Sequence, residues 1–234
     1  MLSSSFSLCA AVLAAVLAIG CDRANVSAGS QHSATAAALA TSGGVPTDSI
    51  SERADRGRIQ GRADAPVWFI EASDFQCPFC KIFHDSAYPQ IVRAYVATGK
   101  VRMAYLNFPL SIHQHSLVAA EAAMCASVQD HFWPMHDSLF ASQDRWASTA
   151  DPMPVFQALA GEVGASVPAW RSCMDSHATR ALIQADRDRS RSAGVNSTPS
   201  FFIGDQRIEG AAPYAAFRDT IEAQLAKHAK PPAR

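Results

Sequence analysis

The sequence predicts an α/β fold in which a helical segment interrupts a small sheet domain. Two runs of apolar, β-branched and aromatic residues, 65–73 and 100–108, have the character of strands and flank a stretch with helical periodicity. Residues 114–193 are helical in pattern, and two short strand-like runs and a helix follow them. The predicted order is therefore βαβ, a helical block, and ββα.

Each element of this order has local support. Pro78 suits the first turn of a helix over 78–97, because its missing N–H has no partner there, and Pro89 should kink or break that helix. Gly194 is typical of a residue that ends a helix, and Gly204-Asp205 of a hairpin turn. Residues 213–228 carry apolar side chains at helical spacing, which predicts an amphipathic helix.

The N-terminus has the features of an export signal. The first 20 residues carry no charged side chain, and residues 8–19 form one apolar run that is shorter than the about 20 residues of a bilayer-spanning helix. The run ends in "LAIGC", which resembles a bacterial lipobox with Cys21 as the lipidated residue. We expect residues 1–20 to be a lipoprotein-type signal peptide and the protein to be exported to the periplasm or cell envelope. Simple cleavage and release is the alternative, because Ala18 replaces the usual leucine.

Composition divides the rest of the chain. Residues 21–55 are rich in Ala, Ser, Thr and Gly and contain no aromatic residue, so we expect a flexible tether that holds the domain to a membrane by the lipid anchor alone. The remaining residues suffice for one domain with a sizeable core. We place the first part of the sheet domain at 56–112, the helical insertion at 113–190 and the second part at 191–230.

Charge argues against nucleic-acid binding. The formal net charge is −1, and no dense cluster of Lys and Arg is interleaved with aromatic residues. The run "RDRSRS" at 187–192 is interpreted as a solvated helix end. No nucleic-acid partner is therefore expected.

The motif "CPFC", with Cys77 and Cys80, lies where the first strand runs into the first helix. A zinc site needs four ligands, but the histidines are scattered and no second cysteine pair is present, so no metal is expected. A purely structural disulfide across two residues closes a loop too small to remove much unfolded-state entropy. A cysteine at a helix N-terminus instead gains thiolate character from free N–H groups and the helix dipole. This favours redox chemistry, with Cys77 at an exposed helix N-terminus and Cys80 one turn further in.

A non-enzymatic alternative stays open at this point. A copper-handling lipoprotein could use Cys77 and Cys80 as soft ligands. The absence of Met- or His-rich sequence around the motif argues against it.

The sequence "IEASDFQCPFC", the helical insertion and "GVNSTPSFFIG" together resemble the DsbA-like branch of the thioredoxin superfamily. The resemblance extends over residues 58–228 and implies a thioredoxin fold with an inserted helical domain. It implies that Cys77 is the nucleophile and that Cys80 resolves mixed disulfides. No cofactor is implied.

The same resemblance assigns three further residues. It makes Pro199 a cis-proline and Thr198 its predecessor in the loop beside the active site. Glu71, six residues before the first cysteine, matches a buried acid near the resolving cysteine, where a carboxylate could shuttle the proton of that thiol.

The resemblance implies an oxidase that introduces disulfides into exported proteins and is recycled by a membrane redox partner. One departure leaves the direction open: the dipeptide between the cysteines is Pro-Phe, where strongly oxidising members have Pro-His. Phe79 cannot stabilise a thiolate by charge, so isomerase and reductase remain alternatives, and Thr198 also occurs in isomerase-like relatives.

The other cysteines complete the accounting. Cys9 leaves with the signal, and Cys125 and Cys173 are the remaining pair in the folded part. Both fall in helical segments beside apolar residues, so we expect them to point inward and form a structural disulfide in an oxidising compartment. Two buried free thiols are the alternative.

Overall fold

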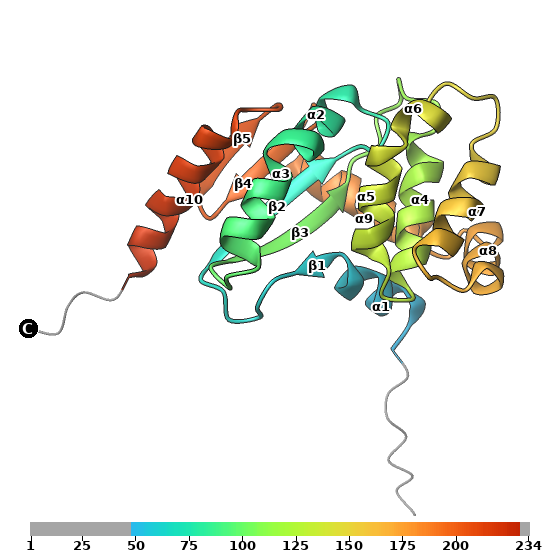
Figure 1. The fold of residues 1–234 in the computed structure, drawn as a ribbon, viewed down its shortest axis with the longest axis horizontal. Coiled ribbons are helices and arrows are strands. Elements are labelled where there is room, and N and C mark those ends of the chain that lie inside the picture. The colour runs from blue at the N-terminus through green and yellow to red at the C-terminus, as the bar shows by residue number, and fades with distance from the viewer. Residues whose placement is uncertain (1–47, 230–234) are drawn as a thin grey trace, which may run out of the picture. The chain divides into compact units, whose positions relative to one another are not determined.

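The structure is a computed structural model that describes residues 48–229. A five-stranded sheet carries helices on both faces and lies beside a helical block (Figure 1). The strands are Ile59–Gln60 (β1), Val67–Ser73 (β2), Val101–Asn107 (β3), Ser200–Ile203 (β4) and Gln206–Glu209 (β5). The α-helices are Ile50–Gly57 (α1), Pro78–Ser86 (α2), Tyr88–Ile91 (α3), Ser116–Ser127 (α4), Phe132–Ala141 (α5), Gln143–Trp146 (α6), Met153–Glu162 (α7), Val167–Asp175 (α8), Arg180–Ser192 (α9) and Tyr214–His228 (α10). The predicted α/β fold with a helical insertion is confirmed.

The strand order β1-β3-β2-β4-β5 places β2 at the centre of the sheet. β2 and β3 are parallel, in register from Val67 opposite Val101 to Ser73 opposite Asn107, and the other pairs are antiparallel. The carboxyl ends of β2 and β3 therefore meet at one edge of the sheet. The cysteine motif follows β2 at that edge.

An aromatic core fixes α2 and α10 against one face of the sheet. Phe83 of α2 lies with its ring centroid 4.4 Å from that of Phe201 on β4, and Phe217 of α10 packs 4.8 Å from the same ring. Phe69 of β2 completes the group, and all four side chains are fully buried. Burying an aromatic side chain stabilises the fold by about 1.5–3 kcal/mol, so this cluster holds the active-site helix firmly on the sheet.

The opposite face of the sheet is covered by α9, which packs on β3. Helices α4, α5, α7 and α8 form the block beside the sheet in Figure 1, around a second core with the buried indoles of Trp146 and Trp170. The predicted helical block at 114–193 is thus observed as α4 to α9.

Several element boundaries follow from single residues. Pro89 breaks the expected helix as predicted: α2 ends at Ser86, and α3 begins at Tyr88 with the proline in its first turn. A π-helix at Val92–Val96, which the sequence did not predict, continues α3. Gly194, with φ of 82°, follows the end of α9.

One expected boundary differs. Residues 50–55, assigned to the tether, belong to α1. Ser49 caps this helix by accepting from the N–H of Glu52, whose side chain accepts from the N–H of Ser49 in turn. The helix also buries Ala54 in the second core, so residues 50–55 belong to the folded domain and not to the predicted tether.

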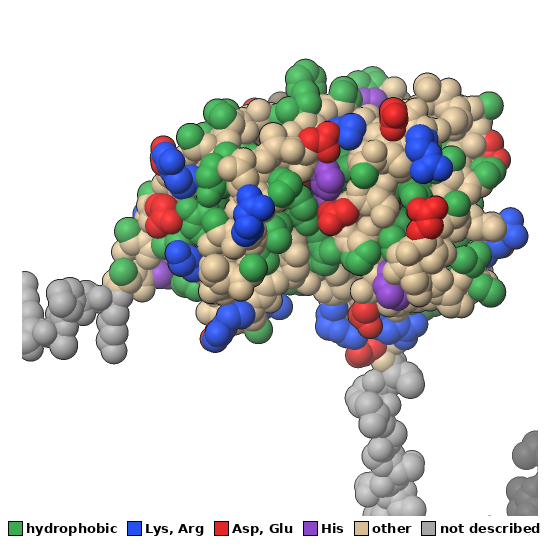
Figure 2. Space-filling model, in the orientation of Figure 1, with side chains coloured by type: hydrophobic (Ala, Val, Ile, Leu, Met, Phe, Trp, Pro, Cys, Tyr) green, Lys and Arg blue, Asp and Glu red, His purple; other side chains and the backbone are tan. Residues whose placement is uncertain are grey.

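The predicted signal peptide 1–20, Cys9, Cys21 and the rest of the tether up to residue 47 lie outside the described residues. In residues 48–229 no helix combines the length and apolar character needed to cross a membrane. Acidic and basic side chains lie singly over the face that carries α2, α3 and α5, without a large patch of either sign (Figure 2).

Candidate functional site

Cys77 is the N-cap residue of α2. Its backbone is extended, with φ of −71° and ψ of 124°, and its carbonyl accepts the first helical hydrogen bond, from the N–H of Lys81. Pro78 occupies the first turn, where a missing N–H leaves no donor unpaired. The sulfur of Cys77 therefore lies at the end of the helix where free N–H groups and the positive end of the dipole favour an anion.

The two thiols of the motif titrate in opposite directions. The pKa of Cys77 is lowered to about 6, mainly because the Cys80 thiol hydrogen-bonds to its sulfur, with further help from Thr198 and the N–H groups of Phe79 and Cys80. Burial raises the pKa of Cys80 well above its usual value, and the neighbouring sulfur raises it further. Near neutral pH the reduced site therefore holds one thiolate and one thiol.

The loop before β4 lies against the first cysteine. The Thr198–Pro199 peptide bond is cis, and the Thr198 carbonyl oxygen is 3.5 Å from the Cys77 sulfur. The Pro199 carbonyl accepts from the N–H of Gly210, which ties the loop to the end of β5. The fold thus brings together the motif and a loop more than 100 residues away in the sequence.

The expectation that Cys77 is exposed is wrong: the residue is 3% exposed. The Thr198 loop covers it on one side, and on the other the Gln143 amide of α6 donates to the Cys77 carbonyl over 3.2 Å. On the same helix, Phe79 and Ile82 are 59% and 51% exposed. An exposed apolar surface, formed by one face of α2, therefore lies next to a cysteine that is almost completely buried.

Glu71 lies in the middle of β2 and is fully buried. Burial raises the pKa of its carboxyl to about 7, although Ser73 and His84 oppose the shift. The Ser73 hydroxyl also lowers the pKa of Cys80, so it lies close to both groups. Among the described residues, neither carboxylate oxygen of Glu71 nor the hydroxyls of Ser73 and Tyr105 make a hydrogen bond. This buried polar cluster next to the second cysteine can hold or move a proton.

Asp74 caps the turn that leads into the motif. One carboxylate oxygen accepts from the N–H of Gln76 at 2.8 Å, and the other accepts from the N–H of Leu110 at 2.9 Å. His113 lies 2.7 Å from that second oxygen. Asp74 therefore ties the motif turn to the loop after β3, which sequence reasoning did not predict.

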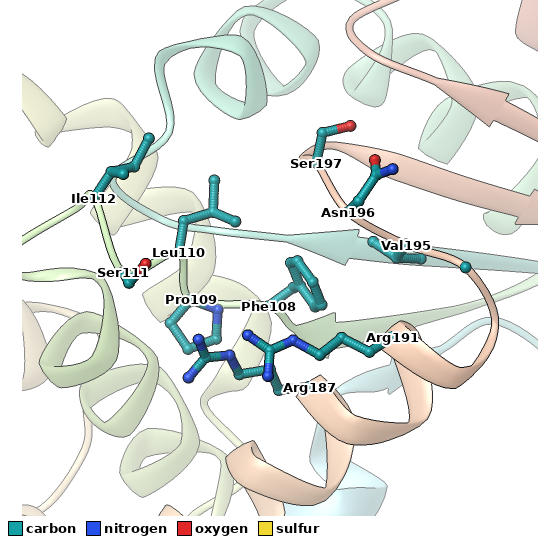
Figure 3. A pocket seen from close by; sticks show the side chains of 11 residues that line it. Phe108, Pro109, Leu110, Ser111, Ile112, Arg187, Arg191, Val195, Asn196 and Ser197 are labelled. Atoms are coloured by element: carbon teal, nitrogen blue, oxygen red, sulfur yellow. The ribbon is translucent and has the colours of Figure 1, made fainter.

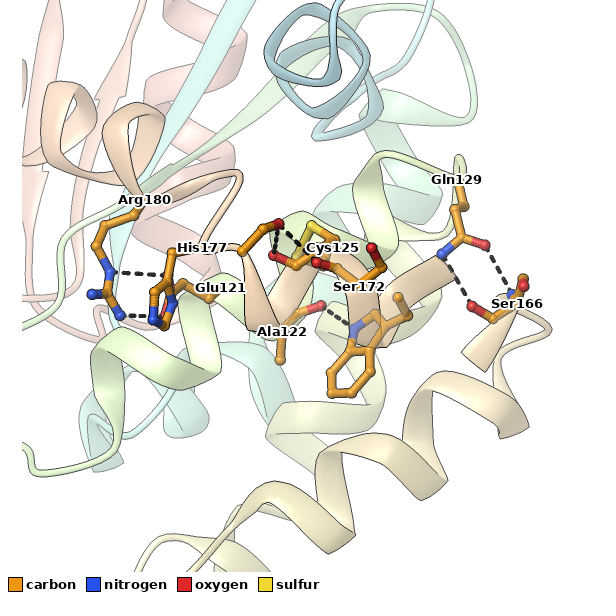
Figure 4. Close-up of a disulfide and its surroundings, with 11 residues drawn as sticks. Glu121, Ala122, Cys125, Gln129, Ser166, Ser172, His177 and Arg180 are labelled. Atoms are coloured by element: carbon orange, nitrogen blue, oxygen red, sulfur yellow. Dashed lines mark hydrogen bonds and ion pairs between the residues drawn. A yellow bond between two sulfur atoms is a disulfide. The ribbon is translucent and has the colours of Figure 1, made fainter. Parts of the chain in front are cut away.

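Cys125 and Cys173 form a disulfide between α4 and α8 (Figure 4). Next to it the Trp170 indole N–H donates to the Ala122 carbonyl at 2.9 Å, which joins the same two helices. Gln129 extends the connection through its bonds to the backbone of Ser166. The disulfide thus lies inside the helical block and apart from the motif at the sheet edge.

One histidine of α5 is a buried polar group. His136 is buried among aromatic rings, including Phe75 and Phe140. Ligand atoms of His84, His136 and Asp137 lie within 4.8 Å of one another, which makes this the one group of three or more His, Cys, Asp or Glu side chains at metal-binding distances in residues 48–229. Neither cysteine of the motif belongs to it.

Comparison with known proteins agrees with this geometry. A family model described as thioredoxin matches residues 53–223. "Disulfide bond formation protein D" of Bacillus subtilis is 25% identical over 173 residues, which cover 71% of this chain and 76% of that protein. The crystal structure of oxidised BdbD from Bacillus subtilis is similar with a TM-score of 0.67 and 26% identity, over 73% of this chain and 94% of the other.

A second kind of relative shares part of its length with this chain. "Na(+)/H(+) antiporter NhaA 3" of Salinispora tropica is 31% identical over 175 residues, which cover 74% of this chain but 26% of the antiporter.

The crystal structure of Wolbachia pipientis α-DsbA1 has a TM-score of 0.65 at 24% identity and covers 73% of this chain and 91% of the other. The similarity to this Wolbachia protein shows that the two chains share a fold.

Proposed function

Because the chain belongs to the thioredoxin family and is a DsbA-like thiol:disulfide oxidoreductase, we propose that it introduces disulfides into exported proteins through Cys77 and Cys80. One observation carries the proposal: the low-pKa sulfur of Cys77 lies at the N-terminus of α2 and against the Thr198–Pro199 loop. A stable thiolate is a good leaving group, which favours transfer of the disulfide from this protein to a substrate.

The reaction begins with the Cys77–Cys80 disulfide. A substrate thiolate attacks the Cys77 sulfur, the bond between the two cysteines breaks, and the Cys80 sulfur leaves as a thiolate that takes up a proton. A second substrate thiolate then attacks the substrate sulfur of the mixed disulfide and expels Cys77 as a thiolate. The substrate gains one disulfide and the protein gains two electrons.

The surroundings of the two cysteines support this sequence of steps. The raised pKa of Cys80 keeps its thiol protonated after it leaves, and the buried Glu71 carboxyl, with a pKa of about 7, can supply or accept that proton. The Thr198 backbone next to Cys77 offers an edge on which an extended substrate segment can pair, a form of β-augmentation.

Turnover requires reoxidation of the reduced motif. We assign this to a membrane redox partner that accepts the two electrons. Export through residues 1–20 and a lipid anchor at Cys21 would keep the domain near that partner, and the Cys125–Cys173 disulfide is in keeping with an oxidising compartment. If lipid is the anchor, wild type should be recovered in the membrane fraction and a Cys21→Ala variant in the soluble fraction. Recovery of the variant with membranes would favour another mode of retention.

The reduction potential of the motif against glutathione tests the direction. A value near −120 mV, as in strong oxidants, supports the proposal, whereas about −180 mV favours an isomerase and about −270 mV a thioredoxin-like reductant. Copper or zinc bound stoichiometrically by the reduced protein, without exchange activity, would favour the metal-handling alternative.

A further inference from the structure

A groove beside the Thr198–Pro199 loop lies on the α9 side of the sheet, away from the exposed face of α2. Its volume is about 770 Å³, and it runs between the loop after β3, residues 108–112, and the loop after α9, residues 194–197 (Figure 3). Ser197, at one end of the groove, directly precedes the residue that touches the Cys77 sulfur. A substrate joined to that cysteine therefore passes close to the groove.

The walls of this groove are mostly apolar. Phe108, Leu110 and Val195 line it, and Ile112 at its rim is 81% exposed. A second cavity of about 220 Å³ shares part of the lining at Pro109 to Ser111 and continues along α9 toward the start of α4. Because the two cavities share these lining residues, an extended chain could pass from one into the other.

Two arginines give the groove a positive charge. Arg187 and Arg191 lie one turn apart on α9, and Figure 3 shows both side chains extending toward Phe108 and Pro109. Within residues 48–229 neither guanidinium has a carboxylate at ion-pair distance, and the buried Nε of Arg187 makes no hydrogen bond. Arg180, on the same helix, differs because it pairs with Glu121.

Two unpaired like charges at this spacing repel each other, and a buried guanidinium N–H without an acceptor costs free energy. A carboxylate placed between the two guanidinium groups would remove the repulsion. Arginine also binds carboxylates in a two-pronged geometry that gives the stronger class of hydrogen bond. The charge of the groove therefore favours an acidic occupant, and its walls favour an apolar neighbour beside that acid.

We propose that this groove binds an extended segment of the substrate that carries Asp or Glu near its reactive cysteine. The inference rests on the proposed function, because the mixed disulfide at Cys77 places the segment. Four loop residues, 194–197, separate α9, which carries the arginines, from Thr198 at the Cys77 sulfur. A substrate segment that follows this loop, with a rise of about 3.3 Å per residue, would place the acid roughly three to five residues from the cysteine.

The test uses the oxidised protein in a single turnover with an excess of short single-cysteine peptides, two of which join as a disulfide while the Cys77–Cys80 bond is reduced. One peptide has Asp four residues from the cysteine, and its partner has Asn at that position; both are made with the polar residue on either side. In one of the two orientations the Asp peptide should reduce the Cys77–Cys80 disulfide with a second-order rate constant about fivefold larger than that of the Asn peptide. The preference should vanish in about 0.5 M salt, which screens the charges.

The double variant Arg187→Gln/Arg191→Gln should oxidise both peptides at the rate that wild type shows with the Asn peptide. A matched control, Arg53→Gln/Arg171→Gln, removes the same charge from positions on α1 and α8 outside the groove and should keep the preference. Equal rates for Asp and Asn peptides in the wild type, in both orientations, would overturn the inference while leaving the exchange reaction intact. A preference that persists in the Arg187/Arg191 variant would also overturn it. No exchange with any peptide would instead refute the proposed function itself.

Discussion

The two cysteine pairs of this protein are about equally buried but differ in chemistry. Cys77 and Cys80 are 3% and 0% exposed, and Cys125 and Cys173 are 1% and 8% exposed. Exposure therefore cannot explain why one pair should exchange electrons and the other should not. The position of each sulfur in its helix separates the pairs.

Cys77 caps the N-terminus of α2, where free N–H groups stabilise a thiolate. Cys125 and Cys173 lie in the last turns of α4 and α8, where the dipole disfavours negative charge. The pairs also differ in sequence separation. Two residues lie between Cys77 and Cys80, whereas Cys125 and Cys173 are 48 positions apart. A long loop gives a disulfide its stabilising effect, and a helix N-terminus gives a thiol its reactivity.

The largest expected effect separates the roles within the reactive pair. Cys77→Ser should abolish exchange with a peptide disulfide, because the low-pKa sulfur is lost. Cys80→Ser should instead accumulate mixed disulfides on Cys77, since no second thiol can resolve them. Nonreducing gels with a single-cysteine substrate distinguish the two, and trapped complexes in the Cys77 variant would reverse the assignment.

Removal of the Cys125–Cys173 disulfide should lower the stability of the protein without changing its exchange reaction. Cys125→Ala/Cys173→Ala should lower the free energy of unfolding by about 4 kcal/mol, the chain-entropy value for a loop of this length. The exchange rate of the folded fraction should stay within about twofold of wild type. Denaturant unfolding and peptide oxidation measure the two quantities. A loss of exchange in fully folded variant protein would contradict the separation of roles.

Glu71→Gln should raise the free energy of unfolding above neutral pH. The carboxyl has a pKa of about 7 in the fold and an ordinary value when unfolded, so the folded state binds more protons between these values. Stability therefore falls as pH rises from about 4.5 to 7, by about 3 kcal/mol, and the amide removes that loss. Denaturant unfolding at pH 5 and pH 8 should give free energies of unfolding for wild type and variant that are closer to each other at pH 5 than at pH 8. Parallel profiles would mean that Glu71 ionises normally.

The smallest effect concerns the thiolate itself. The alkylation rate of Cys77 in the reduced protein should rise about tenfold between pH 5 and 7, with a midpoint near 6. The Cys80→Ala variant, which removes the donor to the Cys77 sulfur, should have a higher midpoint. A midpoint near 8.5 in the wild type would show that neither the helix nor the second cysteine acts on the sulfur.

Sequence reasoning succeeded where the signal is local. The strand–helix junction at the motif and the break at Pro89 depend on neighbouring residues, and both are observed. The helix α1 was missed although Ser49 and Glu52 carry the spacing of a capping box, because the surrounding composition indicated a tether. Attention to that spacing would have found it.

Other features depend on residues far apart in the chain. The burial of Cys77 comes from Gln143 and the Thr198 loop, which no local pattern connects to the motif. The arginines of α9 were interpreted as a solvated helix end, and their place in a groove follows from the path of the loop after β3. Such proximity arises from tertiary packing and is not encoded in periodicity or spacing.

Differential labelling tests the contrast between the pairs most directly. The oxidised protein is treated briefly with a mild reductant, alkylated and analysed by mass spectrometry. We predict label on Cys77 and Cys80 while Cys125 and Cys173 remain linked, because a thiolate attacks the motif disulfide at the helix N-terminus far faster than the one inside the helical block. Equal early labelling of all four cysteines would contradict the account.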